Sequence, residues 1–300
     1  MARHLEPGRL VTVEVPATGA NLGPGFDCFG LALDWYEQVQ LEVLTAGYHI
    51  EVSGESADEL PRDESHLIIR SALFGLADLG VDAPGLGLRC HNTIPHGRGL
   101  GSSAAAIVAG LVAAASLAGM APDRQWLLGH ANAIEGHPDN VAAGIYGGFV
   151  LAYESDGIRV AQAQVEGEVQ AAVFIPDTPV ATSAARDLLP QTVPHADAAA
   201  NAGRAALLVH ALTADPDLLL DATRDWLHQS YREPAMPRSY ELVKTLRSKG
   251  FAAVISGAGP AVLVLGRSAE LNPLASVAAP GFELSRLGIG VAARVIAPTP

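Results

Sequence analysis

The stretch that decides the fold is Gly97-Arg-Gly-Leu-Gly-Ser-Ser103, a glycine-rich loop that leads directly into a run of small apolar residues. Glycine lets backbone N–H groups approach a ligand without interference from a Cβ atom, and the first turn of a helix offers N–H donors that have no partner within the helix. The helix dipole adds attraction for an anion. The loop therefore predicts a phosphate site at a helix N-terminus, with an ordinary glycine–serine helix start as the alternative.

Two other phosphate motifs do not fit this loop. It lacks the Gly-Lys-Ser/Thr ending of a Walker motif, and no acidic residue follows at the spacing of a dinucleotide fingerprint. Ser102 and Ser103 could cap the helix expected over 104–118, or one hydroxyl could instead reach a metal. The uncharged run from Gly99 to Pro122 is long enough for a membrane span, but its Ala, Gly and Ser content favours a buried helix.

Composition narrows the function classes. A chain of 300 residues suits one large domain or two smaller ones, and 49% apolar residues exclude global disorder. A net charge of −13 with no Lys/Arg cluster argues against nucleic-acid binding. Two cysteines, Cys28 and Cys90, cannot form a disulfide framework or a four-ligand zinc site. The N-terminus has no apolar signal segment, so we expect a cytoplasmic protein with no membrane partner.

Residue patterns predict two α+β domains, divided in the polar stretch 154–168 into residues 1–160 and residues 161–300. A glycine- and proline-rich loop is expected over 16–27. The expected strands are 10–15, 31–33, 39–44, 49–52, 86–90, 147–153, 169–175, 252–255, 262–265 and 290–296. The expected helices are 67–79, 104–118, 123–134 with Asp123 as N-cap, 183–189, 197–212, 216–227 and 239–248.

Three motifs together resemble the GHMP kinases, which phosphorylate small molecules. Pro95-His-Gly-Arg-Gly-Leu-Gly-Ser-Ser-Ala-Ala105 resembles their phosphate loop, and Ser256-Gly-Ala-Gly-Pro-Ala261 resembles their C-terminal glycine motif. Val15-Pro-Ala-Thr-Gly-Ala-Asn-Leu-Gly-Pro-Gly-Phe-Asp27 resembles the opening motif of the homoserine kinases, one branch of the family. The order and spacing of the motifs span nearly the whole chain, so a chance match of all three is very improbable.

The resemblance implies a two-domain GHMP kinase-like α+β fold with a ribosomal-protein-S5-domain-2-like N-terminal domain that binds ATP and a ferredoxin-like C-terminal domain that clamps the substrate. It implies ATP-dependent phosphorylation of the side-chain hydroxyl of L-homoserine, with Mg²⁺ as cofactor, in threonine biosynthesis. Another small-molecule kinase of the family, or a catalytically silent ligand-binding protein on the same scaffold, stays open as an alternative. Homodimer formation also stays open.

The resemblance further implies which residues bind the substrate. Asp27 matches the aspartate that pairs with the substrate ammonium, and Asn21 adds hydrogen bonds beside it. Arg186 and Arg232 match the carboxylate-binding segments, and arginine forks bind carboxylates bidentately. Thr182 precedes Arg186 by one helical turn and could face the same site. His137 is expected to orient the substrate, and Gly259 to support the substrate or the phosphate loop from the other domain.

Glu135-Gly-His-Pro-Asp-Asn140 is the densest polar cluster in an apolar region, and homoserine kinases carry this segment or a variant. The resemblance makes Asp139 the candidate base, with Asn140 beside it. Glu135 and Ser103 are the expected Mg²⁺ ligands, although Ala133 stands where related sequences often carry a second glutamate.

The ATP site is expected to include His66, where the family usually has asparagine, because histidine can also hydrogen-bond a purine edge. The expected phosphate-binding residues are His96, Gly97, Arg98, Gly99, Leu100, Gly101, Ser102 and Ser103.

Overall fold

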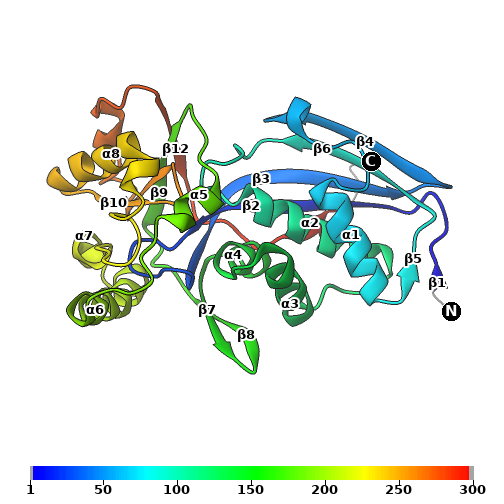
Figure 1. The fold of residues 1–300 in the computed structure, drawn as a ribbon, viewed down its shortest axis with the longest axis horizontal. Coiled ribbons are helices and arrows are strands. Elements are labelled where there is room, and N and C mark those ends of the chain that lie inside the picture. The colour runs from blue at the N-terminus through cyan, green and yellow to red at the C-terminus, as the bar shows by residue number, and fades with distance from the viewer. Residues whose placement is uncertain (1–2, 297–300) are drawn as a thin grey trace.

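The computed structural model describes residues 3–296, which form two main β-sheets with helices packed on them. Figure 1 shows the longer sheet with α1 to α4 in one half and the smaller sheet with α5 to α8 in the other. A short parallel pair, β1 (Arg3–His4) and β5 (Val81–Asp82), lies near the N-terminus. The fold class inferred from the motifs, a two-domain GHMP kinase-like α+β fold, is confirmed.

The first sheet has seven strands in the order β13-β2-β3-β6-β4, with β7 paired to β3 and β8 paired to β7. Val39, Leu41 and Val43 point to the buried face of β3, while Gln38 and Glu42 lie on the exposed face. This alternation is typical of a sheet with one face in the core and the other in water. The strands are β2 (Leu10–Ala20), β3 (Phe29–Val43), β4 (Gly47–Gly54), β6 (Gly85–Asn92), β7 (Phe149–Ser155), β8 (Gly157–Ala163) and β13 (Arg294–Ile296).

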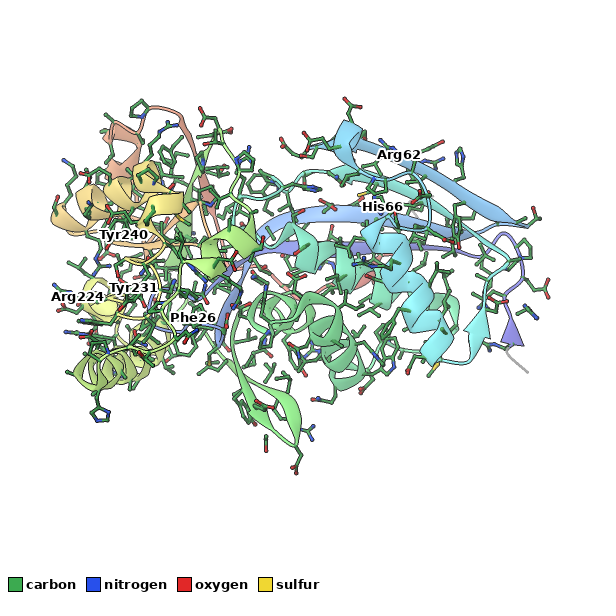
Figure 2. The ribbon with its side chains drawn as sticks, in the orientation of Figure 1. Phe26, Arg62, His66, Arg224, Tyr231 and Tyr240 are labelled. Atoms are coloured by element: carbon green, nitrogen blue, oxygen red, sulfur yellow. The ribbon has the colours of Figure 1, made fainter. Side chains whose placement is uncertain are left out.

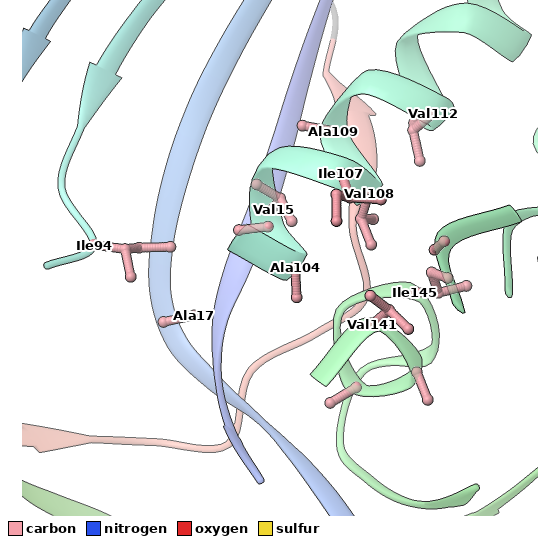
Figure 3. Packing of buried hydrophobic residues seen from close by; sticks show 14 of the residues in the cluster. Val15, Ala17, Ile94, Ala104, Ile107, Val108, Ala109, Val112, Val141 and Ile145 are labelled. Carbon is pink, nitrogen blue, oxygen red and sulfur yellow. The ribbon is translucent and has the colours of Figure 1, made fainter. Parts of the chain in front are cut away.

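Helix α2 fills the space between this sheet and the other helices. It is buried over most of its length, and Figure 3 shows Ala104, Ile107 and Val108 facing β2 and α4. Small side chains allow such close packing on several sides. The helices of this half are η1 (Ala57–Glu59), α1 (Leu67–Asp78), α2 (Ser102–Leu117), α3 (Arg124–Glu135) and α4 (Asp139–Tyr146). Within residues 3–296, no helix is both long and apolar enough to cross a membrane.

The second sheet is antiparallel, with the order β10-β11-β9-β12, which is the strand order of a ferredoxin-like fold. Alternate residues of β9 point to opposite faces: Val173 belongs to the large core shared with the first half, and Phe174 to a smaller core under α8. The elements are β9 (Val169–Pro176), α5 (Thr182–Asp187), α6 (His195–Thr213), η2 (Pro216–Leu218), α7 (Leu219–Ala222), η3 (Glu233–Ala235), α8 (Pro237–Ser248), β10 (Ala252–Ile255), β11 (Val262–Arg267), η4 (Asn272–Ser276) and β12 (Phe282–Leu287).

The predicted division between residues 160 and 161 falls inside β8, which belongs to the first sheet. The second sheet begins with β9 at Val169, and β13 returns at the end of the chain to pair with β2. We therefore propose that the boundary lies at 164–168 and that the last strand belongs to the first domain.

Several local predictions need correction. The expected loop 16–27 begins later, because β2 continues to Ala20 through a register shift between Pro16 and Thr18. A proline is tolerated at such an irregularity because no ladder hydrogen bond is required of it there. The strands expected at 31–33 and 39–44 form one strand, β3. The helix expected over 216–227 ends at Ala222, and strands β8 and β12 and helix α4 were not predicted.

Replacing Gly110 of α2 by alanine should lower the free energy of unfolding by about 1–3 kcal/mol. Its Cβ would lie 2.5 Å from the carbonyl oxygen of Ile68 and 2.8 Å from the Cβ of Ser71, both on α1. Gly129 of α3 is the matched control, since open space surrounds it. Gly129→Ala should stabilise the protein by about 0.5–1 kcal/mol through helix propensity. Urea denaturation measures both, and a Gly110→Ala variant at least as stable as the wild type would contradict the close helix crossing.

Candidate active site

A cavity of about 270 Å³ lies where the two halves meet, and it gathers most of the residues that the sequence singled out. Its lining comes from the loop before α2, the segment between α3 and α4, α5, and the turn between β10 and β11. The predicted residues that line it are Asn21, His66, His96, Gly97, Arg98, Gly99, Leu100, Gly101, Ser102, Ser103, Glu135, His137, Asp139, Asn140, Thr182, Arg186 and Arg232.

The glycine loop needs its glycines for conformation as well as for access. Gly99 and Gly101 have φ values of 76° and 70°, in the left-handed region that favours glycine. A Cβ at Gly101 would lie 1.9 Å from the Thr18 hydroxyl. Ser102 and Ser103 are the first helical residues and not caps, since Gly101 occupies the N-cap position. The first-turn amides of α2 therefore open on the cavity, where they can bind an anion.

The turn after β10 braces the loop from the second half. Ser256 Oγ donates to the Gly99 carbonyl at 2.6 Å, and Ala261 N donates to the Arg98 carbonyl at 3.0 Å. Gly257 and Ala258 of this turn line the cavity. Gly259, which was expected to support the substrate or the loop, does not line it, and a Cβ there would clash with the Met236 side chain.

Arg98 also ties the loop to the second half. Its guanidinium donates to the carbonyl oxygens of Pro176 at 2.9 Å and Asp177 at 2.8 Å, and to that of His96 at 2.9 Å. These three bonds occupy all three nitrogens of the guanidinium. Its side chain thus braces the loop, while its positive charge stays beside the cavity.

Ser103 and Glu135 meet at the start of α2. The Ser103 hydroxyl donates to Glu135 Oε1 at 2.6 Å, so a hydroxyl and a carboxylate from different helices share one point of the cavity wall. Oxygen donors of this kind suit Mg²⁺, which keeps water or phosphate oxygens as its remaining ligands. Within residues 3–296 no group of three or more His, Cys, Asp or Glu side chains could hold a metal. Ala133, two residues before Glu135, is exposed and does not line the cavity.

Asp139 is buried at the first position of α4, where its carboxylate is well supported. Its Oδ1 accepts from Asn140 N at 2.7 Å and lies 3.2 Å from His137 Nδ1. This hydrogen bond is the main reason why the pKa of His137 is raised, with the charges of Asp139 and Glu135 adding to it. Asn140 is fixed in turn by the Thr18 hydroxyl, which donates to its Oδ1 at 2.8 Å.

The two groups expected to bind opposite ends of the substrate are paired with each other. Arg186 donates to Asp27 through Nη2 to Oδ1 at 2.6 Å and through Nη1 to Oδ2 at 3.1 Å. Both side chains are about one third exposed. The pKa of Arg186 is raised, mainly by this hydrogen bond. Asn21 Oδ1 accepts from Asp27 N at 2.9 Å and so fixes the left-handed backbone at Asp27. Asp27 thus contacts the cavity through Arg186.

Unlike Arg186, Arg232 is only 1% exposed and forms no ion pair within residues 3–296. Its Nη1 donates to the Gly257 carbonyl at 3.3 Å, and its Nε has no partner. Burial, and then the nearby charge of Arg186, lower the pKa of Arg232. A buried guanidinium with spare donors on a cavity wall is suited to a carboxylate or phosphate ligand.

His66 caps α1, at the far end of the cavity from Arg232. Its Nδ1 accepts from Ile68 N at 3.3 Å, so the proton of the neutral ring is on Nε2, which has no partner. Burial lowers the pKa of His66 to about 4. Figure 2 shows His66 at the start of α1 and Phe26 where the two halves meet. A buried donor on the cavity wall can bind an acceptor atom of a ligand.

The residues at the site that were not predicted from the sequence include Thr18, Phe26, Glu37 and Asn92. Thr18 and Phe26 lie inside the opening motif, which was a signal that could have pointed to them. Glu37 and Asn92 are buried polar residues of the cavity wall, joined through Cys90, whose Sγ contacts Glu37 Oε1 at 3.5 Å and Asn92 Oδ1 at 3.0 Å. Burial raises the pKa of Glu37.

Comparison with protein families matches both halves of the chain. Residues 66–148 match the GHMP kinases N terminal domain, and residues 199–277 match the GHMP kinases C terminal domain. A homoserine kinase of Streptomyces coelicolor is 52% identical over 283 residues, which cover 93% of this chain and 92% of that protein. A homoserine kinase of Mycolicibacterium vanbaalenii is 47% identical over 303 residues, 97% of this chain and 96% of that protein.

Solved structures agree with these matches. The crystal structure of homoserine kinase from Cytophaga hutchinsonii superposes with a TM-score of 0.84 at 30% identity and covers 96% of this chain and 97% of its own. The L. major mevalonate kinase in complex with R-mevalonate superposes with a TM-score of 0.70 over 97% of this chain and 99% of its own. At 16% identity, this second likeness shows a common fold alone.

Histidine titration should distinguish the surroundings of His137 and His66. His137 should titrate above the ordinary pKa of 6.5, and Asp139→Asn should lower its pKa because the main hydrogen bond to the charged ring is weakened. His66, with a pKa of about 4, is the internal control and should not move. NMR of the ring protons measures both, and a His137 pKa unchanged by Asp139→Asn would contradict the contact.

Proposed function

The chain belongs to the GHMP kinases, and from its site we propose that it transfers the γ-phosphoryl group of ATP to the side-chain hydroxyl of L-homoserine, giving O-phospho-L-homoserine. This is an alcohol phosphotransferase of threonine biosynthesis. The observation that carries the proposal is that a helix N-terminus suited to phosphate and two arginines suited to carboxylate open on the same cavity.

ATP and homoserine would bind at different ends of the cavity. The amides from Gly99 to Ser103 would hold the ATP phosphates, because unpaired N–H groups and the helix dipole both favour anions there. His66 would donate a hydrogen bond from its Nε2–H group to an acceptor atom of the adenine ring. Arg186 and Arg232 would bind the homoserine carboxylate, and Asp27 its ammonium group.

The substrate zwitterion would replace contacts that the site now makes with itself. The ion pair between Asp27 and Arg186 would open. Asp27 would then bind the substrate ammonium group, and Arg186 would bind the substrate carboxylate. The side-chain hydroxyl would then point toward Asp139 and the phosphates, in line for attack on the γ-phosphorus. Asp139 would accept the hydroxyl proton, with His137 and Asn140 holding its carboxylate in place.

Ser103 and Glu135 would hold Mg²⁺ through their oxygen atoms beside the phosphates. When bound, the ion neutralises part of the phosphate charge in the transition state. Waters and phosphate oxygens would supply the other ligands, because Mg²⁺ readily keeps several of them.

An assay coupled to ADP release tests the function with homoserine, mevalonate, shikimate and galactose as acceptors. We expect turnover of homoserine and little of the others, because only homoserine offers both a carboxylate and an ammonium group at the right spacing from its hydroxyl. Thermal shifts with ATP–Mg²⁺ and homoserine should be measured in parallel. Folded protein that binds both compounds but releases no ADP would contradict the proposal and indicate a silent binding protein.

The metal assignment has its own test. Glu135→Gln should raise the Mg²⁺ concentration needed for half-maximal rate by at least about tenfold, since it removes a charged ligand. Glu154→Gln, on the exposed end of β7, is the matched control and should behave as wild type. The rate is measured as a function of Mg²⁺ at saturating ATP and homoserine. Equal Mg²⁺ dependence in the two variants would exclude Glu135 as a ligand.

A further inference from the structure

We propose that His228 is a positioning residue of the site: its neutral ring holds the Arg232 guanidinium against the cavity while leaving the positive charge free for the substrate carboxylate. The inference rests on the proposed function, because it takes Arg232 to bind that carboxylate. His228 does not line the cavity, so it would act through Arg232.

The contact between the two residues is direct and fully buried. Arg232 Nη1 lies 3.2 Å from His228 Nδ1, and the two side chains are 1% and 0% exposed. A guanidinium has donors and no acceptor, so Nδ1 must offer its lone pair to it. This bond, with that to Gly257, fixes the guanidinium at the cavity wall.

The opposite side of the ring fixes the same tautomer independently. His228 Nε2 lies 2.8 Å from the Gly23 carbonyl oxygen, which can only accept a hydrogen bond. The proton is therefore on Nε2 and Nδ1 is bare, so the ring is neutral. Burial also lowers the pKa of His228, and Arg232 adds to this, although Asp225 at 3.7 Å opposes it.

The Asp225 carboxylate accepts hydrogen bonds from the backbone that directly follows it. The donors are the backbone amides of Leu227 at 2.8 Å, His228 at 3.2 Å and Gln229 at 2.7 Å. These bonds shape the turn that carries His228. The Asp225 carboxylate lies 3.7 Å from His228 Nε2, whereas Arg232 contacts the other ring nitrogen, Nδ1. The residue next to Arg232 is thus a neutral acceptor, with the carboxylate one step further away.

The Phe26 ring contacts both His228 and the Arg232 guanidinium. It stacks on His228 with centroids 5.2 Å apart, and Arg232 and Arg186 lie 5.3 and 5.6 Å from its centroid. One aromatic ring therefore contacts both arginines, and the next residue, Asp27, pairs with Arg186. The two arginines differ in one respect: Asp27 neutralises the charge of Arg186, whereas the side-chain hydrogen-bond partners of Arg232 within residues 3–296 are neutral, namely His228 and the Gly257 carbonyl.

A neutral partner has a clear advantage at this position. A carboxylate bonded to Arg232 would cancel its charge and compete with the carboxylate of the substrate. An imidazole satisfies one buried N–H and orients the guanidinium without cancelling its charge. The cost of burying an uncompensated charge would then be offset when the substrate binds.

Two substitutions of His228 distinguish the effect of its hydrogen bond with Arg232 from that of its hydrogen bond with the Gly23 carbonyl. In His228→Asn the amide can take the place of Nδ1 and keep an acceptor for Arg232, whereas in His228→Gln it takes the place of Nε2 and keeps only the bond to Gly23. Both are assayed with homoserine and with homoserinol, in which a hydroxymethyl group replaces the carboxylate. Melting temperatures of both variants are recorded as a check on folding.

We expect His228→Gln to raise the KM for homoserine by about tenfold with little change in kcat, since a hydrogen bond to a charged group is lost. Its preference for homoserine over homoserinol, as a ratio of kcat/KM values, should fall by a similar factor. His228→Asn should keep both values within about threefold of wild type. Equal effects of the two variants, or an unchanged preference in His228→Gln, would overturn the proposal.

A measurement on the wild type does not depend on whether the variants fold. Nitrogen NMR of protein labelled in its histidines should show His228 as the neutral Nε2–H tautomer at neutral pH, and an imidazolium or the Nδ1–H tautomer would overturn the proposal. Turnover of homoserine by the wild type distinguishes failure of the proposed function from failure of the His228 proposal. If the wild type does not turn over homoserine, both proposals fail. If the wild type is active and the kinetics of His228→Gln are unaltered, only the positioning role of His228 is excluded.

Discussion

The site depends on the close approach of the glycine loop to the turn after β10, where Ser256 Oγ donates to the Gly99 carbonyl. A Cβ at Gly99 would lie 2.2 Å from the Ser256 carbonyl oxygen, so the approach requires glycine there. The bond from Ala261 N to the Arg98 carbonyl extends the same contact. Because this close approach places both the glycine loop and the turn beside Arg232, the same constraint would align the two proposed substrate sites.

Because the net charge of the chain is −13, binding of an anion such as ATP requires a few positive groups placed at the site itself. In the proposed function, a helix N-terminus and two arginines bind the anionic groups, and the two arginines differ in their partners. Arg186 is paired with Asp27, and we propose that the substrate zwitterion replaces both partners. Arg232 is held by the neutral His228 ring and the Gly257 carbonyl. This arrangement favours a ligand with both charges over a simple anion, because only the zwitterion can also satisfy Asp27 when its ion pair opens.

Features with local causes could be predicted from the sequence, and those with tertiary causes could not. The helix after the glycine loop and the Asp123 cap of α3 were predicted and are confirmed. Helix α4 was missed because a proline at 138 precedes it, and the helix expected over 216–227 is cut short by a turn built on Asp225. His228 was missed as a site residue because its partner Gly23 lies 205 residues away, a separation that no pattern reveals.

A crystal structure of the protein with homoserine and a non-hydrolysable ATP analogue would test the proposed site as a whole. We expect the phosphates of the analogue at the start of α2, the homoserine carboxylate on Arg186 and Arg232, and the homoserine hydroxyl between Asp139 and the terminal phosphate. Phosphates bound away from the amides of the glycine loop, or a homoserine carboxylate that does not contact Arg232, would contradict the proposed site.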